Sequence, residues 1–269
     1  AVQIASEARD VVVDCDQPIN ADHFCLLPRL YKEGCTARII THHKSVEFFE
    51  PMLLDSAHIM ERDVMILHKQ MPNALPIYDE QDVYTTLPYI RGYDEDVLYE
   101  LDDNISFKMS GAGHIIGAMQ ISIYIRTLSG HTEEIAFSGD LGNTLFNNPF
   151  VEKFKPIKNC SVFIGECTYG NKERSCVEND RDKDIEKLQT VIRETCIDGN
   201  GRVFIPCFAL QRTQTMLKIL YDIYGDDKNF KLPIVVDSPL AIKLTNVFSE
   251  TLTGEEKILM DKIINWKNV

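Results

Sequence analysis

The sequence lacks several features that would assign it to a class at once. None of its 269 residues lies in an apolar run long enough to cross a bilayer, which excludes a membrane-spanning protein. The eight cysteines include no CxxC pair, and we expect neither a signal sequence nor a transit peptide before them. We therefore expect reduced thiols and a cytoplasmic location. With 44% hydrophobic and 26% charged residues, the composition indicates an ordinary globular protein, neither disordered nor fibrous.

Positive charge is also scarce. Twenty-eight Lys and Arg residues stand against forty-one Asp and Glu residues, which gives a formal net charge of −13. A protein of this charge repels polyanions unless its positive groups are collected in one place. Generic cationic binding of nucleic acid is therefore not expected, and the acidic side chains, spread along the whole length, should form a solvated surface.

Short apolar runs alternate with longer segments of helical period, which is the pattern of an α/β protein. Between residues 97 and 138 the pattern changes, because apolar and polar residues alternate one by one over 119–126. This alternation predicts antiparallel sheet with one face in water. Apolar runs that predict strands cover residues 10–15, 37–40, 161–165, 202–208 and 232–238.

Three helices are predicted from their ends and their period. The first runs from Pro51 to about Lys69 and starts at the proline. The second covers about 182–197 and is stopped by Gly199, and the third covers about 210–224 and ends at Gly225. The chain is long for one domain and short for two. We expect one domain over residues 1–198 and the first part of a second over 199–269, which is too short for a complete α/β domain.

Polar residues follow apolar strands at four places, where rigid strand ends can hold ligands and leave one side open to substrate. Each place sets His, Asp or Glu beside small residues, and these are ligand types that zinc prefers. Taken singly, none predicts a metal site, because an Asp in a Ser-Gly-Asp turn usually forms the turn. The four segments are ADHFCLLPRL at 21–30, SGAGHIIGA at 110–118, IAFSGDLGN at 135–143 and FIGECTYGN at 163–171.

Together, in this order and spacing, the four segments resemble the β-CASP branch of the metallo-β-lactamase superfamily, which contains nucleic-acid-processing hydrolases. Three further segments also resemble segments of bacterial relatives of the messenger-RNA 3′-end-processing nuclease, namely 52–63, 205–214 and 235–243. The matches to the family motifs are Asp22, His23 and the Leu27-Pro28-Arg29-Leu30 turn in the first metal-binding motif, His114 as the later single histidine, Asp140 as the acid that bridges two metals, and Glu166 as the acid that marks the branch.

The resemblance implies an α/β fold, namely a metallo-β-lactamase αββα sandwich with the start of an inserted β-CASP α/β domain. It implies a hydrolase that cleaves RNA phosphodiester bonds with two zinc ions, in which Asp22 orients the attacking water and Glu166 holds a protonating histidine. Arg212, at the start of a helix, is an implied phosphate contact, with a surface salt bridge as the equal alternative. RNA is the expected partner, no membrane is expected, and a homodimer is left open. The implied metal ligands are Asp22, His23, His114 and Asp140.

The first motif departs from the family pattern. Pro18 and Asn20 occupy the positions of its first two histidines, and neither replaces an imidazole. In the family a long stretch separates the motif from the turn before it, whereas here the two lie only a few positions apart. We therefore expect that this stretch is missing between residues 16 and 21, through a deletion or an omitted loop. The family's two later histidine motifs have no counterpart in the sequence. We therefore expect only part of a two-zinc site.

Other polar residues allow two interpretations. Asp14 and Asp16 either substitute for the missing ligands or, as we favour, cap the strand turn. His42 and His43 follow an apolar strand, and exposed loop histidines are favoured over contacts to substrate phosphate. Tyr169 either stacks on a base or packs under the cap domain.

Two rival functions come from other classes. The first is a metal-free pseudo-enzyme that binds RNA or a protein partner, as Pro18 and Asn20 suggest. The second is a metallo-β-lactamase-fold hydrolase of a small molecule, which the net charge of −13 fits better than it fits RNA binding. The β-CASP-like stretch after Glu166 argues against this second rival. A ribonuclease needs a local basic strip even on an acidic protein.

Overall fold

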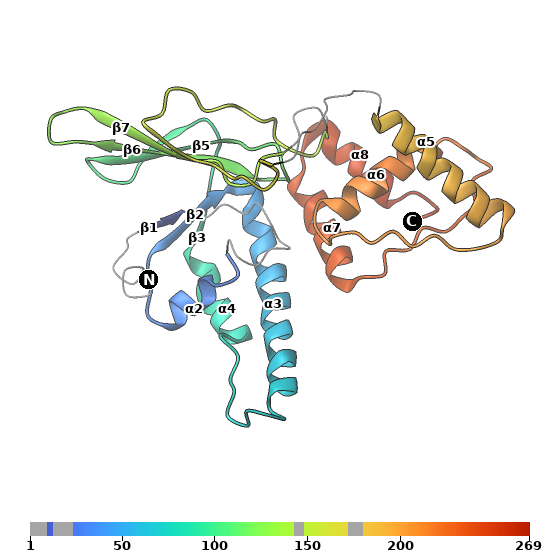
Figure 1. Cartoon of the computed structure of the whole chain (residues 1–269), viewed down its shortest axis with the longest axis horizontal. Helices are drawn as coiled ribbons and strands as arrows, with labels where there is room; N and C mark the ends of the chain where they lie inside the picture. Colours follow the sequence, from blue (N-terminus) through green and yellow to red (C-terminus); the bar gives the residue numbers. More distant parts are fainter. Residues whose placement is uncertain (1–9, 13–23, 143–147, 172–179) are drawn as a thin grey trace. The chain divides into compact units, whose positions relative to one another are not determined.

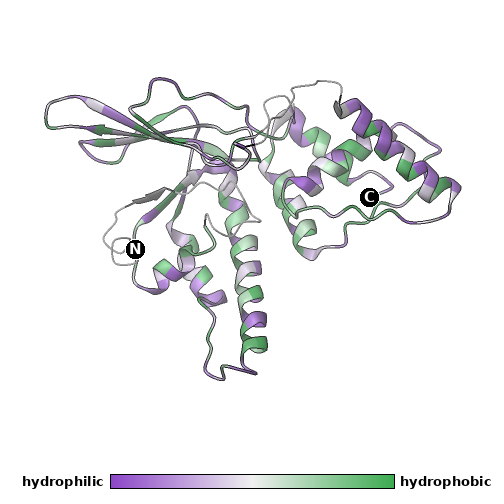
Figure 2. Ribbon diagram, in the orientation of Figure 1, coloured by the Kyte–Doolittle hydropathy of each residue, from purple (hydrophilic) through white to green (hydrophobic). Residues whose placement is uncertain are grey.

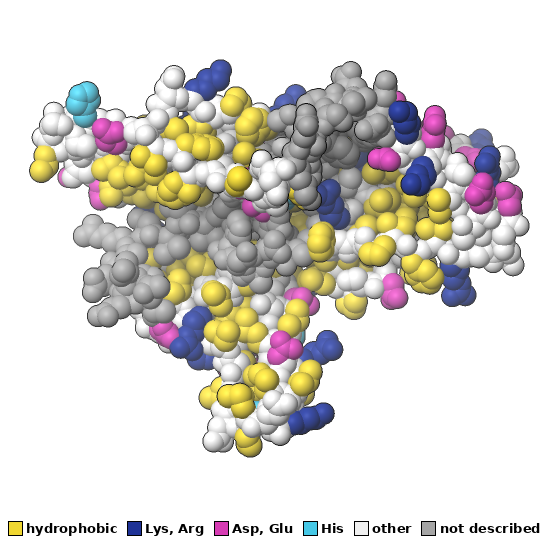
Figure 3. All heavy atoms as spheres, viewed as in Figure 1, with side chains coloured by type: hydrophobic (Ala, Val, Ile, Leu, Met, Phe, Trp, Pro, Cys, Tyr) yellow, Lys and Arg dark blue, Asp and Glu magenta, His cyan; other side chains and the backbone are white. Residues whose placement is uncertain are grey.

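The structure is a computed structural model of the chain, and it describes residues 10–12, 24–142, 148–171 and 180–269. The chain divides into two units, Ala1–Glu166 and Cys167–Val269 (Figure 1). On the face shown in Figure 3, acidic and basic side chains are interspersed over each unit. None of the helices in the described ranges is both long and apolar enough to cross a membrane.

The first unit contains a three-stranded parallel sheet in the order β1-β2-β3. Parallel neighbours need a crossover between them, and helices supply it here. Ile39 and Ile40 point to opposite faces of the central strand and both are fully buried, so this strand is covered on both sides. The strands are β1 (Asp10–Val12), β2 (Arg38–His42) and β3 (Ile90–Tyr93), and the connecting elements are α2 (Leu27–Lys32), η1 (His43–Ser45), α3 (Val46–Leu67), α4 (Glu80–Thr86) and η2 (Leu87–Tyr89).

Helix α3 begins earlier than predicted. It starts at Val46, directly after η1, and Pro51 lies inside the helix rather than at its first residue. Phe48 and Phe49, in the first turn of the helix, are almost fully buried. Burial of these two rings outweighs the backbone hydrogen bond that a proline cannot donate. Tertiary packing, and not the proline, therefore sets the start of this helix.

The first unit also contains a five-stranded sheet in the order β4-β5-β6-β7-β8. The predicted antiparallel arrangement is confirmed for its first four strands, whereas β8 runs parallel to β7. The strands are β4 (Leu98–Glu100), β5 (Ile105–Gly111), β6 (Met119–Arg126), β7 (Thr132–Phe137) and β8 (Val162–Ile164).

One face of β6 was predicted to be in water, and over the first half of the strand this is wrong. Gln120 and Ser122 are buried, with 1% and 4% of their surface exposed. The Gln120 side-chain amide donates to the carbonyl oxygens of Gly111, at 3.1 Å, and Lys155, at 2.7 Å. The segment that contains Lys155 therefore covers this face. The Gln120 amide hydrogen-bonds to two backbone carbonyls there instead of to water.

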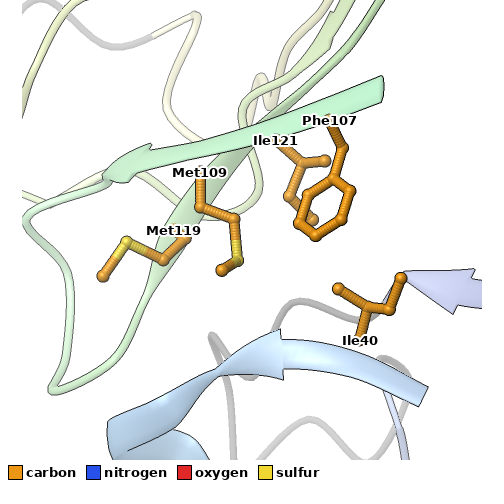
Figure 4. Close-up of a cluster of buried hydrophobic side chains, with 5 residues drawn as sticks. All are labelled: Ile40, Phe107, Met109, Met119 and Ile121. Atoms are coloured by element: carbon orange, nitrogen blue, oxygen red, sulfur yellow. The ribbon is translucent and has the colours of Figure 1, made fainter. Parts of the chain in front are cut away.

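The two sheets of the first unit face each other through a hydrophobic cluster. Ile40 points from β2 toward Phe107 and Met109 of β5 and Met119 and Ile121 of β6 (Figure 4). Helices α2, α3 and α4 lie on the other side of the three-stranded sheet (Figure 1). This arrangement confirms the α/β class and gives three of the four layers of the expected sandwich. Among the described residues of this unit, no helix forms the fourth layer.

The second unit is built from helices with hydrophobic and hydrophilic residues along each of them (Figure 2). The helices predicted near 182–197 and 210–224 are confirmed, and Gly199 and Gly225 follow them as predicted. The helices are α5 (Asp180–Ile192), which continues into the π-helical turn η3 (Arg193–Asp198), α6 (Arg212–Tyr224), α7 (Pro239–Thr251) and α8 (Gly254–Ile264).

The units divide at a point earlier than the expected boundary near residue 198. The reason is that α5 packs within the second unit, where Ile192 shares a core with Leu220, Phe230 and Trp266. The rings of Phe230 and Trp266 stack with their centroids 5.9 Å apart. Which family domain each unit represents stays a prediction.

The strands predicted over 202–208 and 232–238 are wrong for this structure. Both segments lie outside regular structure, and within the described residues neither forms a ladder with another strand. The apolar side chains of the first segment are largely exposed, with 84% of Phe204 accessible, whereas in the second segment Val235 is 77% accessible and Ile234 packs against the core of the unit. A strand is stable only when its N–H and C=O groups find a partner strand. Apolar composition alone was therefore an insufficient signal.

The cluster between the sheets predicts a large effect for Phe107→Ala. Removing this fully buried ring leaves a cavity, and we expect the free energy of unfolding of the first unit to fall by about 3–5 kcal/mol. Urea unfolding followed by far-UV circular dichroism measures the loss, and Trp266 fluorescence reports the second unit separately. Leu128→Ala, in the exposed turn between β6 and β7, is the control and should change little. Equal effects of the two variants would contradict the cluster's role.

Candidate active site

The loop between β5 and β6 holds His114 in a closed turn. The Ala112 N–H donates to the carbonyl oxygen of Ala118 at 3.0 Å, which closes the base of the loop. Ile115 and Ile116 are buried and anchor the loop in the core, whereas His114 is only half-buried. The Gly-Ala-Gly-His sequence thus places one imidazole at the end of a strand, on a short and tightly bonded turn.

The loop after β7, residues 138–142, lies directly against the His114 loop. The Gly142 N–H donates to the carbonyl oxygen of Ala112 at 3.0 Å. A Cβ atom on Gly142 would overlap the carbonyl of Gly113 and the backbone nitrogen of His114, so only glycine permits this approach. Asp140 lies two residues before this contact and is half-buried. The loops that carry two of the predicted metal ligands therefore touch.

Glu166, directly after β8, fastens the same loop. Its backbone N–H donates to the Ser138 hydroxyl at 2.9 Å, and its carboxylate accepts the N–H of Leu141 at 2.6 Å. The Ser138 N–H in turn donates to the carbonyl oxygen of Ile164 at 2.9 Å. A carboxylate that accepts a backbone N–H forms a strong, charge-assisted bond. Glu166 thus stabilises the turn that contains Asp140, and its catalytic role stays a prediction.

His42 lies elsewhere than predicted. It is the last residue of β2 and only 2% of it is exposed, so the expectation of an exposed loop histidine is wrong. Neither ring nitrogen has a hydrogen-bond partner among the described residues. Burial lowers the pKa of His42 to about 4, and the charge of Glu152 opposes this shift. His43 is exposed as predicted, and its Nδ1 lies 3.0 Å from a carboxylate oxygen of Asp94.

Several predicted site residues lie outside the described residues. These are the predicted metal ligands Asp22 and His23, the residues Pro18 and Asn20 at the positions of the missing histidines, and the alternative ligands Asp14 and Asp16. Within the described ranges, no group of three or more His, Cys, Asp or Glu side chains could hold a metal ion. His114 and Asp140 offer donors that zinc accepts, but a catalytic site needs three protein ligands. The described donors therefore fit zinc in type and not in number.

Arg212 lies in the second unit, as the first residue of α6, with an exposed side chain. The residue before it, Gln211, has φ of 63° and ψ of −49°, and the Arg212 N–H donates to the carbonyl oxygen of Leu210 at 2.8 Å. This is a strained three-residue turn. Burial raises the pKa of the Cys207 thiol, and the nearby Arg212 guanidinium opposes this. The turn was not predicted, since glutamine is not a residue typical of positive φ.

Tyr169 is half exposed, which leaves both of its interpretations open. The sequence also did not single out Glu152, which accepts the Gly117 N–H in the His114 loop, or Lys44, which pairs with Glu152. Neither follows a recognisable motif. The only available signal was the glycine-rich loop 111–117, because such a loop brings its backbone close to other segments.

Several curated proteins similar to the chain are named as ribonucleases. Endoribonuclease YSH1 of Gibberella zeae is 28% identical over 235 residues, which cover 87% of this chain and 26% of that protein. Ribonuclease TTHA0252 of Thermus thermophilus is 24% identical over 227 residues, 84% of this chain and 46% of that protein. The RNase J-like protein of Methanocaldococcus jannaschii is 25% identical over 244 residues, 89% of this chain and 55% of that protein.

No protein-family model matches the chain. The names of the relatives nevertheless fit an RNA-processing nuclease of the β-CASP metallo-β-lactamase type, and the resemblance predicted from the motifs is confirmed. The chain spans about a quarter to a half of the length of these curated relatives.

His42 predicts a loss of stability in acid. The native state keeps this imidazole neutral down to about pH 4, whereas the unfolded chain takes up the proton near 6.5. Between these values the unfolded state binds more protons, so stability falls as the pH falls. A single histidine with this shift contributes roughly 3 kcal/mol across the window. Chemical unfolding of the first unit at pH 7 and at pH 4.5 measures the fall.

His42→Phe should reduce this pH dependence, because the ring stays buried and no proton is taken up. The matched control is His131→Gln, which replaces an exposed histidine in the turn between β6 and β7 and should keep the pH dependence of the unaltered chain. A His42→Phe variant that loses as much stability in acid as the unaltered chain would show that other groups cause the effect.

Proposed function

We propose that the chain is part of a zinc-dependent ribonuclease that cleaves RNA phosphodiester bonds in RNA processing or decay. The observation that carries the proposal is the contact between the His114 loop and the Asp140 loop, through the Gly142 N–H and the Ala112 carbonyl. The contact joins two of the motifs that resemble the β-CASP family, and the similar proteins named as ribonucleases support the substrate class. In this proposal the first unit is a metallo-β-lactamase domain and the second is the start of a β-CASP domain.

The proposal gives each predicted residue a task. Asp22, His23, His114 and Asp140 would hold the zinc, and bound zinc would polarise the phosphate and supply a nucleophilic water near neutral pH. Asp22 would also orient that water. The hydrogen bond from the Leu141 N–H to the Glu166 carboxylate would keep the neighbouring Asp140 in position to bind the metal.

Arg212 would contact an RNA phosphate in this proposal. Its planar guanidinium offers paired donors that match phosphate oxygens. The exposed side chain and the strained turn before it favour a functional position, because such strain clusters at functional sites. Since the chain carries a net charge of −13, local positive groups of this kind are what an RNA substrate requires. A cytoplasmic location belongs to the proposal, and a homodimer is left open.

A second candidate function is a metal-free RNA-binding protein with the same fold. It is favoured by Pro18 and Asn20, which stand where the family has histidines. The two candidates differ in whether the bond is broken. Both predict binding to RNA, and only the first predicts cleavage that depends on metal.

Cleavage of an end-labelled single-stranded RNA tests the proposal. We expect cleavage that stops after treatment with a chelator and returns when zinc is added, because the donors are of the type that zinc prefers.

Metal analysis after dialysis should find well under two zinc ions per chain, since histidines are missing from the first motif. Binding of the RNA without cleavage under any metal condition would favour the second candidate and contradict the first.

Glu166→Gln separates the two tasks of Glu166. The glutamine carbonyl can still accept the Leu141 N–H, so the loop and the melting temperature should be preserved, whereas the negative charge is lost. We expect cleavage to slow by roughly 10²–10⁴-fold, as is typical when one acid–base function is removed. Glu133→Gln, on an exposed position of β7, is the matched control and should cleave normally. If Glu166→Gln cleaves at the normal rate, Glu166 serves only to hold the loop.

A further inference from the structure

We propose that Glu152 is a positioning residue that fixes the loop carrying His114, and that Lys44 compensates the buried charge of the Glu152 carboxylate. The link to catalysis rests on the proposed function, in which His114 binds the catalytic metal. The positioning itself is a property of the first unit. It follows from contacts between three segments that lie far apart in the sequence.

The two carboxylate oxygens of Glu152 have different partners. Oε2 accepts the backbone N–H of Gly117 at 2.8 Å, and Oε1 lies 2.7 Å from the ammonium nitrogen of Lys44. Only 4% of the Glu152 side chain is exposed. The acid therefore connects the turn after β2, which contains Lys44, to the loop between β5 and β6. Each of these two bonds uses one carboxylate oxygen.

Gly117 is also held from its other side. The Ser45 hydroxyl donates to the Gly117 carbonyl at 3.2 Å. Gly117 has a φ of +75°, and a Cβ atom here would overlap the Ser45 oxygen. The backbone of this residue is thus bonded through both its N–H and its C=O, in a conformation that favours glycine. Because His114 lies three residues earlier in the same closed turn, these bonds help to fix the backbone from which its ring projects.

The burial of the Glu152 charge supports a conformational task. A carboxylate removed from water is costly unless it is both paired and hydrogen-bonded, and a hydrophobic replacement is often as stable. Exposed ion pairs, such as Lys218 with Asp222 on the surface of α6, contribute little to stability. A buried acid aimed at the backbone of one loop serves instead to select one conformation of that loop.

The test compares Glu152→Ala with the double variant Lys44→Met/Glu152→Gln. The first removes the acceptor of the Gly117 N–H, whereas the second removes the ion pair and keeps a carbonyl acceptor in nearly the same place. Hydrogen–deuterium exchange of residues 112–118 should become roughly tenfold to hundredfold faster in Glu152→Ala, as expected for losing a charge-assisted hydrogen bond. The double variant should retain most of the protection. These measurements need neither metal nor RNA.

RNA cleavage by the complete protein gives the second readout. If Glu152 positions His114, Glu152→Ala should lower kcat by tenfold or more and leave KM within about twofold, because a misplaced catalytic group slows the reaction without weakening binding. The double variant should restore most of kcat. Lys32→Met is the matched control, since it removes the ion pair between Lys32 and Asp82, at 2.6 Å in the same unit, and should change neither exchange in 112–118 nor kcat.

Three outcomes would overturn the proposal. The first is unchanged exchange of residues 112–118 in Glu152→Ala. The second is an equal increase throughout the first unit, which would make Glu152 a general stabilising residue. The third is a double variant as fast in exchange as Glu152→Ala, because the ion pair and not the Gly117 bond would then matter. Absence of cleavage by the unaltered protein would contradict the proposed function, and the exchange measurements would still decide the role of Glu152.

Discussion

The close approach of two backbone loops, at Gly142 and Gly113, is the constraint on which the candidate site depends. The sheet creates this approach. Strand β6 is paired with β5 on one side and with β7 on the other, with Ile121 opposite both Met109 and Phe137, so the loop that precedes β6 and the loop that follows β7 leave the sheet side by side. A side chain at residue 142 would separate them. Where His114 and Asp140 stand is thus determined by strand register and by the absence of a Cβ atom.

Both of these loops are fastened by carboxylates that accept backbone N–H groups. Glu166 accepts the Leu141 N–H in one loop, and Glu152 accepts the Gly117 N–H in the other. Charge-assisted bonds of this kind are stronger than bonds between neutral groups. Part of the acidic excess of this protein therefore acts inside the structure. The two acids differ in one respect, since Glu152 is buried and paired with Lys44, whereas Glu166 is exposed.

The α/β class, the antiparallel sheet and two of the three predicted helices were predictable because periodicity and capping residues are local signals. Other predictions failed where a distant segment decides the outcome, as three cases show. Helix α3 starts before Pro51, since two phenylalanine rings are buried in its first turn. Gln120 is buried, because a later segment covers its face of the sheet. The apolar segment 202–208 is not a strand, because no partner strand pairs with it among the described residues.

The sequence by itself determined which residue types stand at the strand ends, and hence that His114, Asp140 and Glu166 were candidates for one site. These motifs are short and continuous, so their order and spacing can be read without coordinates. Only the tertiary structure decided that the His114 and Asp140 loops touch, that His42 is buried without a hydrogen-bond partner among the described residues, and that Glu152 holds Gly117. The last contact joins residues 35 positions apart. Periodicity carries no information about such pairs, because they form only when sheet register and loop packing bring distant segments together.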